Sequence, residues 1–180
     1  MYPYIRMIKE LIKFRNAPKL GLFDTHVSTH RIWPLDLDPW MELNNGRTLT
    51  LYDLGRIPLA SRMGFRKIMS EKRWGMTVAG NTTRYRRRVK LFDKITMKTR
   101  LIGWDQRFLY MEQSMWRGDD CTSHMLIRSA LVQNSMGRAG IVPPSELAIA
   151  FGQPPESPAL PAWVQAWADG DAQRPWPPEM

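Results

Sequence analysis

The spacing of hydrophobic and polar positions changes along this chain and predicts a helix first and strands later. Residues 46–63 carry apolar side chains at helical intervals, and the predicted core stripe is Leu51, Leu54 and Ile57. From about residue 74 to residue 133 the period falls to two, as in a half-buried strand. Residues 22–35 are extended in character, with β-branched side chains and no helical period. This order predicts an α+β fold in which a curved antiparallel sheet wraps a single central helix.

The N-terminal segment, residues 4–15, has the pattern of a short amphipathic helix. Its apolar stripe consists of Ile5, Ile8, Leu11 and Ile12, with the basic side chains away from that stripe. We expect the stripe to pack on the body of the protein. Two alternatives stay open. The basic face could hold the helix weakly at a membrane surface, or the segment could be an organellar targeting sequence, although it is short and contains Glu10.

Length and composition indicate one domain with appended ends, since the chain has 180 residues of which 43% are hydrophobic. We expect the N-terminal helix within residues 1–20, the main domain at 21–142, and a C-terminal helix and tail at 143–180. The pattern around residues 143–151 predicts a short helix capped by Ser145. The proline- and tryptophan-rich remainder predicts an extended tail with one short helical turn.

Charge and cysteine usage narrow the partners and the compartment. A formal net charge of +9 attracts anionic partners, which include nucleic acid, anionic lipid and phosphorylated small molecules. The single cysteine, Cys121, excludes an internal disulfide framework and fits a reducing compartment. The N-terminus lacks the features of a secretory signal, so a cytoplasmic location is expected. The three histidines have no metal-ligand spacing, and no metal is expected.

The stretch Asp36-Leu-Asp38-Pro-Trp-Met-Glu-Leu-Asn44-Asn45-Gly46-Arg carries the clearest chemistry. It places two carboxylates after a predicted strand and Asn-Asn-Gly where the predicted helix begins. A helix start gathers unpaired N–H groups and partial positive charge. Asp38 could attack a carbonyl, or direct water at one, while those N–H groups bind the carbonyl oxygen. This arrangement predicts acyl transfer, with Asp36 as a structural acid. The alternative is that Asp38 is only a turn acid.

This stretch resembles the D-x-D-x-x-G-H-V-N-N-x-x-Y signature of hotdog-fold thioesterases, in the hydroxybenzoyl-CoA thioesterase-like branch with its acyl-CoA thioesterase relatives. Residues 85–95 also resemble the second strand of that family and the Phe-Asp turn that follows it. The resemblance covers roughly residues 22–135. It implies a hotdog fold, and homodimers or dimers of dimers with active sites between subunits. It also implies an acyl-CoA thioester as substrate, with coenzyme A present only as part of that substrate and no separate cofactor.

The resemblance also assigns roles to single residues. Asp38 matches the catalytic carboxylate of the family, and Asn45 and Gly46 match the helix N-terminus whose backbone amide polarises the thioester carbonyl. Asp53 matches an acidic position within the central helix. The chain departs from the signature glycine, histidine and tyrosine at Met41, Glu42 and Thr48. These departures motivate an alternative function, a non-catalytic hotdog module that binds acyl-CoA or acyl-carrier protein.

The densest basic run of the chain consists of Arg84, Arg86, Arg87, Arg88 and Lys90. If residues 82–91 form a strand, the even-numbered members of this run share one face. Neighbouring like charges repel unless anions neutralise them, and arginine forks bind phosphates well. We therefore interpret the four arginines as substrate-binding residues for the phosphates of coenzyme A. A solvated edge or salt bridges between subunits are the alternatives. Nucleic acid is not expected, because no nucleic-acid-binding motif accompanies the run.

Overall fold

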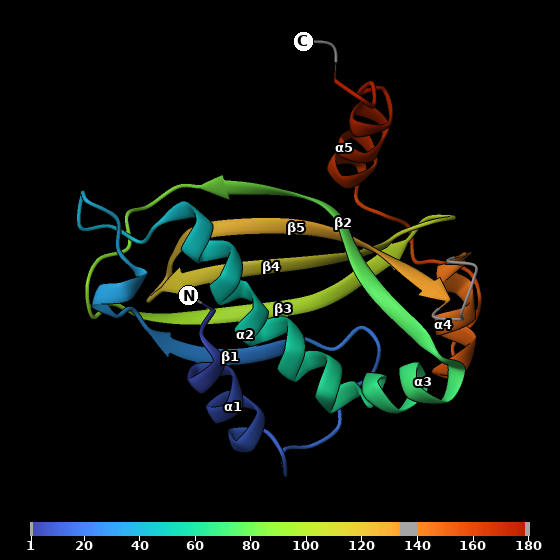
Figure 1. The fold of residues 1–180 in the computed structure, drawn as a ribbon, viewed down its shortest axis with the longest axis horizontal. Coiled ribbons are helices and arrows are strands. Elements are labelled where there is room, and N and C mark those ends of the chain that lie inside the picture. Colours follow the sequence, from blue (N-terminus) through green and yellow to red (C-terminus); the bar gives the residue numbers. More distant parts are fainter. Residues whose placement is uncertain (1, 134–139, 179–180) are drawn as a thin grey trace.

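An antiparallel sheet curves around one long helix, as Figure 1 shows. The computed structural model describes residues 2–133 and 140–178, and within them the sheet has six strands in the order β1-β3-β4-β5-β2, with β6 paired to β5. The strands are β1 (His26–Arg31), β2 (Trp74–Tyr85), β3 (Lys94–Trp104), β4 (Leu109–Arg117), β5 (Asp120–Gln133) and β6 (Ile141–Val142). The predicted antiparallel strands are confirmed, and so is the α+β architecture.

The described helices are α1 (Tyr4–Lys13), α2 (Asn45–Met63), α3 (Phe65–Lys72), α4 (Pro144–Ala150) and α5 (Ala162–Ala172), with a short 3-10 turn η1 (Pro34–Asp36) before α2. Helix α2 is the predicted central helix. It continues through Pro58 to Met63 and ends at Gly64, whose φ of 78° suits glycine. Pro58 could be expected to kink the helix or to begin a second short helix, but the second short helix, α3, begins only after Gly64.

Helix α2 lies in the hollow of the sheet and is buried along most of its length. Leu51, Tyr52 and Leu54 pack against the methionines and isoleucines of the inner sheet face. A Cβ atom on Gly55 would lie 2.4 Å from Thr99 Oγ1, so only glycine permits this approach of helix to sheet. Gln113 joins the two layers by donating from Nε2 to the Tyr52 carbonyl oxygen at 2.8 Å. These contacts fix α2 along the sheet and hence fix where its N-terminus lies.

Helix α1 packs with the opposite face to the one its sequence pattern predicted. Met7 and Glu10 are buried against the body, whereas Ile5, Ile8 and Ile12 are 85%, 56% and 63% exposed. The ion pair of Arg6 with buried Asp36 (Nη1–Oδ2 2.7 Å) sets the rotation of the helix, because it turns the Arg6 side inward. Of the predicted stripe, Leu11 packs against the core, and the expectation is wrong for Ile5, Ile8 and Ile12.

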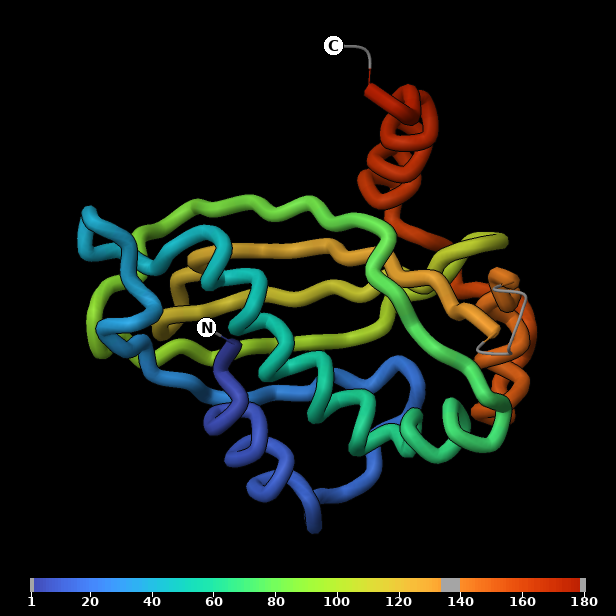
Figure 2. The backbone as a smooth tube through the Cα atoms, in the orientation of Figure 1, coloured from blue at the N-terminus to red at the C-terminus, as the bar shows by residue number. Residues whose placement is uncertain are grey.

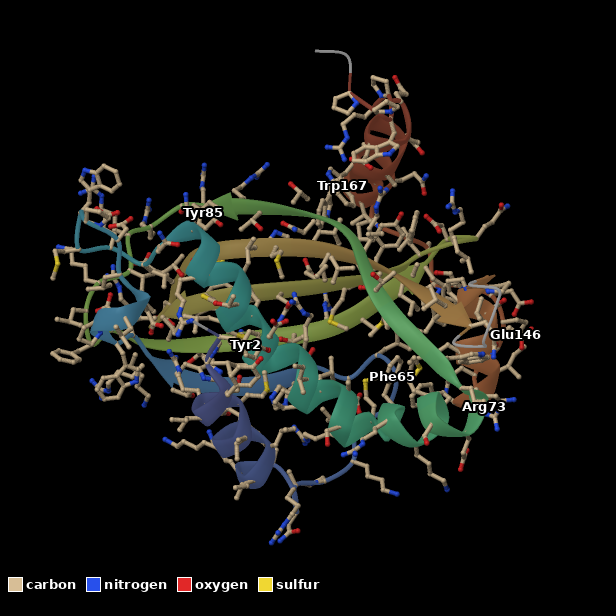
Figure 3. All side chains as sticks on the ribbon, viewed as in Figure 1. Tyr2, Phe65, Arg73, Tyr85, Glu146 and Trp167 are labelled. Carbon is tan, nitrogen blue, oxygen red and sulfur yellow. The ribbon has the colours of Figure 1, made fainter. Side chains whose placement is uncertain are left out.

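The C-terminal region contains two helices. In the first, α4, the N-cap is Pro143 and no side chain caps the helix, so the prediction of a Ser145 cap is wrong. The second, α5, has 11 residues and not one short turn, because Val164 and Trp167 pack on the outer face of the sheet against Tyr110 and Leu126. Figures 2 and 3 show α5 standing at the far side of the sheet from α1, with Trp167 at the end nearest the sheet.

Candidate active site at the start of helix α2

The first turn of α2 contains backbone N–H groups that have no acceptor within the helix. Asn44 caps the helix by accepting the N–H of Arg47 on its Oδ1 at 3.0 Å. Its carbonyl oxygen accepts both the N–H (2.8 Å) and the hydroxyl (3.1 Å) of Thr48. The N–H groups of Asn45 and Gly46 precede the first intrahelical donor, so helix geometry gives them no acceptor within α2. Together with the helix dipole they form a site suited to an anionic oxygen.

The arginine segment reaches this helix start because β2 ends earlier than predicted. The strand stops at Tyr85, so the prediction of a strand over residues 82–91 with alternating arginines is wrong. The N–H groups of Arg86 and Arg87 both donate to the Thr122 carbonyl oxygen, at 2.8 and 3.2 Å, and this convergence turns the chain off the sheet. The loop of residues 86–89 then lies beside residues 42–43, because the Leu43 N–H donates to the Val89 carbonyl oxygen at 2.9 Å.

A cleft of about 220 Å³ lies between the start of α2, the end of β2, the arginine loop and the start of β5. The residues that line it are Glu42, Leu43, Asn45, Thr48, Tyr85, Arg86, Arg87, Arg88, Val89, Thr122 and Ser123. In Figure 3, Tyr85 lies at the end of β2 beside the first turn of α2. The cleft therefore brings together Asn45 and three of the four predicted arginines. Arg84 stays on β2, opposite His124, and does not line it.

Asp36 is the structural acid that the sequence predicted. It is buried between Arg6 of α1 and Arg47 of α2, with a distance of 2.7 Å in each ion pair. Burial alone would raise the pKa of this carboxyl, but the Trp33 N–H and the two guanidinium groups outweigh burial and lower it. Asp36 thus ties both helices to the loop that precedes α2.

Asp38, the predicted catalytic carboxylate, lies in a tight turn. Its Oδ1 accepts the N–H groups of Trp40 (3.0 Å) and Glu42 (3.2 Å), and its side chain is partly exposed. It is not among the residues that line the cleft. The acid that does line the cleft is Glu42, whose Oε1 is 3.1 Å from Arg88 Nε. Sequence reasoning treated Glu42 only as a departure from a family signature. The sequence did contain one indication that Glu42 lies near the site: it follows Asp38 by four residues across a turn.

Asp53 also lies away from the cleft. It forms an ion pair with Arg56, and Arg56 donates to Gln113 Oε1 at 2.9 Å. Burial, followed by the charge of Asp53, raises the pKa of the Tyr2 hydroxyl to about 12. Asp53 therefore belongs to a network between α2, the N-terminus and the sheet.

Two further properties concern the described part of the chain as a whole. Across residues 2–133 and 140–178, no group of three His, Cys, Asp or Glu side chains lies close enough together to hold a metal ion. Over the same ranges, no helix has both the length and the apolar character needed to cross a bilayer.

The fold and the helix-start cleft together define a hotdog-fold protein, and the chain belongs to the thioesterase-like superfamily, whose family model matches residues 32–168. Protein THEM6 of Xenopus laevis is 30% identical over 135 residues, which cover 73% of this chain and 65% of that protein. The chain spans less than two thirds of the length of each curated THEM6 relative that we compared.

Solved structures share the fold at low sequence identity. A mutant 4-hydroxybenzoyl CoA thioesterase complexed with 4-hydroxybenzoyl CoA superposes with a TM-score of 0.62 at 15% identity, covering 71% of this chain and 97% of that one. The hypothetical protein SAV2348 from Staphylococcus aureus, solved in complex with CoA, gives a TM-score of 0.57 at 12% identity, with 81% and 95% covered. The predicted hotdog fold is confirmed.

Proposed function

We propose that this chain hydrolyses acyl-CoA thioesters at the cleft beside the start of α2. The observation that supports this most is the meeting of two kinds of group in one cleft. The first turn of α2 contributes Asn45 to the cleft, followed by Gly46, which is not among the lining residues. The loop of residues 86–88 contributes three arginines, of which Arg88 is paired with Glu42. A coenzyme A thioester needs both, because its carbonyl oxygen becomes negative in the reaction and its carrier bears phosphates.

The helix start provides the electrostatic part of the mechanism. As an oxygen nucleophile attacks the thioester carbonyl carbon, negative charge grows on the carbonyl oxygen. The N–H groups of Asn45 and Gly46 are already oriented, so they stabilise that charge without reorganising. Loss of one such donor costs about 3 kcal/mol of barrier in comparable sites. The C–S bond then breaks, and the coenzyme A thiolate leaves and takes up a proton.

We assign the reacting carboxylate to Asp38, which does not line the cleft but lies in the adjoining turn, where its Oδ1 accepts the N–H of the cleft residue Glu42. The turn hydrogen bonds both go to Oδ1, which orients the carboxylate and leaves Oδ2 as the oxygen for a substrate or water. Acting as base, Asp38 takes a proton from the attacking water. Acting as nucleophile, it forms a mixed anhydride that water then opens. Both routes need the ionised acid, so replacing it with asparagine removes both.

We also propose that the active unit is a homodimer formed through β2. This strand is an edge of the described sheet, is 12 residues long and exposes Met76 and Val78. An uncovered edge of this length is a template for pairing with a second strand. Pairing there places a second subunit beside Tyr85 and the arginine loop, so the partner would supply the wall of the cleft that one chain leaves open.

Thiol release from acyl-CoA, measured with wild type and three carboxylate variants, tests the assignment of Asp38. We expect Asp38→Asn to lower kcat at least 100-fold while the thermal unfolding midpoint stays within a few degrees of wild type. Glu42→Gln should keep kcat within tenfold, because Glu42 forms an ion pair with Arg88. Asp24→Asn is the matched control, since Asp24 also accepts a backbone N–H in a turn, from Gly21 at 2.8 Å, far from the cleft in sequence. Undiminished turnover by Asp38→Asn would reject the assignment.

A second candidate function is a non-catalytic module that binds acyl-CoA or acyl-carrier protein. It is favoured by Glu42 in place of the signature histidine and by the engagement of Asp38 Oδ1 in its own turn. Calorimetry with free coenzyme A and with a thioether analogue of acyl-CoA separates the two functions. Binding that Arg86→Gln/Arg87→Gln weakens, without turnover of any thioester, would support the module. Binding accompanied by turnover supports the hydrolase.

A further inference from the structure

The outward face of α1 is apolar. We call Tyr4, Ile5, Ile8 and Ile12 the outer stripe, and each of these side chains is more than half exposed. They follow one another at helical spacing, so they form a continuous ridge along the helix. Exposed apolar side chains are ordinary when scattered, but a contiguous row usually marks an interaction surface. The opposite face of the same helix, with Met7 and Glu10, is already used for packing on the body.

The exposed charged side chains beside the outer stripe are all positive. Glu10 is the only acid of α1, and it is buried, with 4% exposure. Lys9 and Lys13 are exposed along one flank of the stripe, and Arg15 and Lys19 follow in the exposed chain after the helix. The solvent-facing surface of α1 therefore combines isoleucines with lysines and carries no acid. A partner that fits this surface must be apolar within and negatively charged at its border.

A basic hollow adjoins this flank. A cavity of about 250 Å³ between α1 and the end of β1 is lined by Arg6, Lys9, Glu10, Thr29, His30, Arg31, Trp33 and Lys94. Of its four cations, Arg6 is paired with Asp36, whereas Lys9, Arg31 and Lys94 are exposed. The exposed Trp33 beside them is a residue type enriched at the boundary between water and lipid headgroups. The hollow is thus suited to a phosphate group, which the exposed cations that line it would contact.

The outer stripe is placed where it can meet a large surface. Strand β1 lies at one edge of the described sheet and β2 at the other, and α1 lies on the β1 side of α2 (Figures 1 and 2). Contact through α1 therefore leaves β2 and its free edge unobstructed. This separation distinguishes the outer stripe from the surface that we assigned above to a second subunit.

We infer that α1 docks this protein on an anionic lipid membrane surface. The isoleucines of the outer stripe enter the boundary between headgroups and acyl chains, while Lys9, Lys13 and the basic hollow contact lipid phosphates. This is the mode of an interfacial amphipathic helix, in which apolar burial and attraction to anionic lipid add together. Charge complementarity selects this occupant, because the exposed flank of the stripe carries lysines and no acid. The inference does not depend on the proposed hydrolase activity.

Flotation of the full chain with lipid vesicles tests the inference. We expect binding to vesicles that contain phosphatidylglycerol and phosphatidylcholine, and much weaker binding to phosphatidylcholine alone. Lys9→Gln/Lys13→Gln should weaken binding about 25-fold, since each basic residue at an anionic surface contributes roughly fivefold. Ile5→Asn/Ile8→Asn should weaken it at least tenfold. Turnover of a soluble short-chain acyl-CoA should be unchanged in both variants, which separates this result from a failure of the proposed function.

Matched variants elsewhere on the surface exclude general effects. Arg66→Gln/Lys67→Gln removes two exposed charges from α3, and Ile149→Asn replaces an isoleucine of similar exposure on α4. Both should bind vesicles like wild type, and so should Arg86→Gln/Arg87→Gln. If the arginine-loop variant loses vesicle binding while the α1 variants keep it, the inference is overturned. It is equally overturned if vesicles do not bind and sedimentation shows that Ile5→Asn/Ile8→Asn breaks an oligomer, because a second copy then covers the stripe.

Discussion

Helices α1 and α2 differ in how well the sequence pattern predicts which residues are buried. Helix α1 has the sharper separation of apolar and polar positions, yet three of its four isoleucine and leucine side chains in that stripe face solvent. Helix α2 has a weak separation, because its buried positions include the polar Thr48 as well as Gly55 and Pro58, while the apolar Ile57 is exposed. Spacing therefore identifies which residues share a face of a helix. The contacts of the rest of the chain decide which face is covered.

The contrast between the helices can be tested by deleting an apolar side chain from each. Leu54→Ala in α2 removes a fully buried side chain and should lower the free energy of unfolding by about 4 kcal/mol. Ile8→Ala in α1 removes a side chain that is already more than half exposed, and should change it by less than about 0.5 kcal/mol. Urea unfolding of the two variants and wild type measures both values. A loss above 2 kcal/mol for Ile8→Ala would mean that the stripe is covered in solution.

The next largest effect is expected where the two helices are joined. Asp36→Asn leaves Arg6 of α1 and Arg47 of α2 without their buried anion, and should cost about 3 kcal/mol in the free energy of unfolding. Asp24→Asn, in an exposed turn, is the control and should cost much less. Proteolysis near residues 14–20 should also become faster in Asp36→Asn, since Arg6 sets the rotation of α1. Equal stabilities of the two variants would show that Asp36 does not join the helices.

A smaller effect is expected from pH at His26, which lies between the far ends of the same helices. Its ring contacts Phe14 after α1, and Nδ1 is 3.0 Å from an Arg62 Nη1 of α2. Burial, then the charge of Arg62, lowers the pKa of His26 to about 4. Because this is below the unfolded value of about 6.5, the unfolded chain binds the proton first, and stability falls as the pH drops below about 6.5.

The size of that pH effect can be isolated with one substitution. Between pH 7 and pH 5, His26 should account for about 2 kcal/mol of lost stability. In His26→Gln this part of the pH dependence should vanish, while the part due to buried His30, whose pKa is also lowered by burial, to about 3, should remain. Urea unfolding at the two pH values gives the comparison. An unchanged slope in His26→Gln would contradict the low pKa.

Local patterns predicted the fold well where period and burial agree. The period-two region predicted the strands of the sheet, and Leu51 and Leu54 of the predicted stripe are buried in α2. Ile57 of the same stripe is 40% exposed, so its predicted place in the core is wrong. Helix α3 was missed because it is short. Its apolar residues Phe65, Ile68 and Met69 pack against the core without being fully buried. Helix α5 was predicted as only one short turn. Its length depends on Val164 and Trp167 packing on the outer sheet face, a long-range contact that the proline-rich sequence does not reveal.

The sequence predicted where the helix of the candidate site begins, but it did not predict how the loops around that helix are placed. Asn44 to Gly46 mark a helix start by local chemistry alone, and the cleft lies there. The position of the arginines depended on two N–H groups converging on the Thr122 carbonyl, a long-range contact that no local period encodes. For the same reason the sequence did not distinguish Glu42, which lines the cleft, from Asp38, which lies in the neighbouring turn.

The most direct test of the central claim is the initial rate of thiol release from a panel of acyl-CoA thioesters by the wild-type chain. We predict release that is proportional to protein concentration, exceeds the rate in buffer for at least one acyl group, and is inhibited by free coenzyme A. Tight binding of coenzyme A with no release above the buffer rate for any member of the panel, from acetyl to palmitoyl and benzoyl, would contradict it.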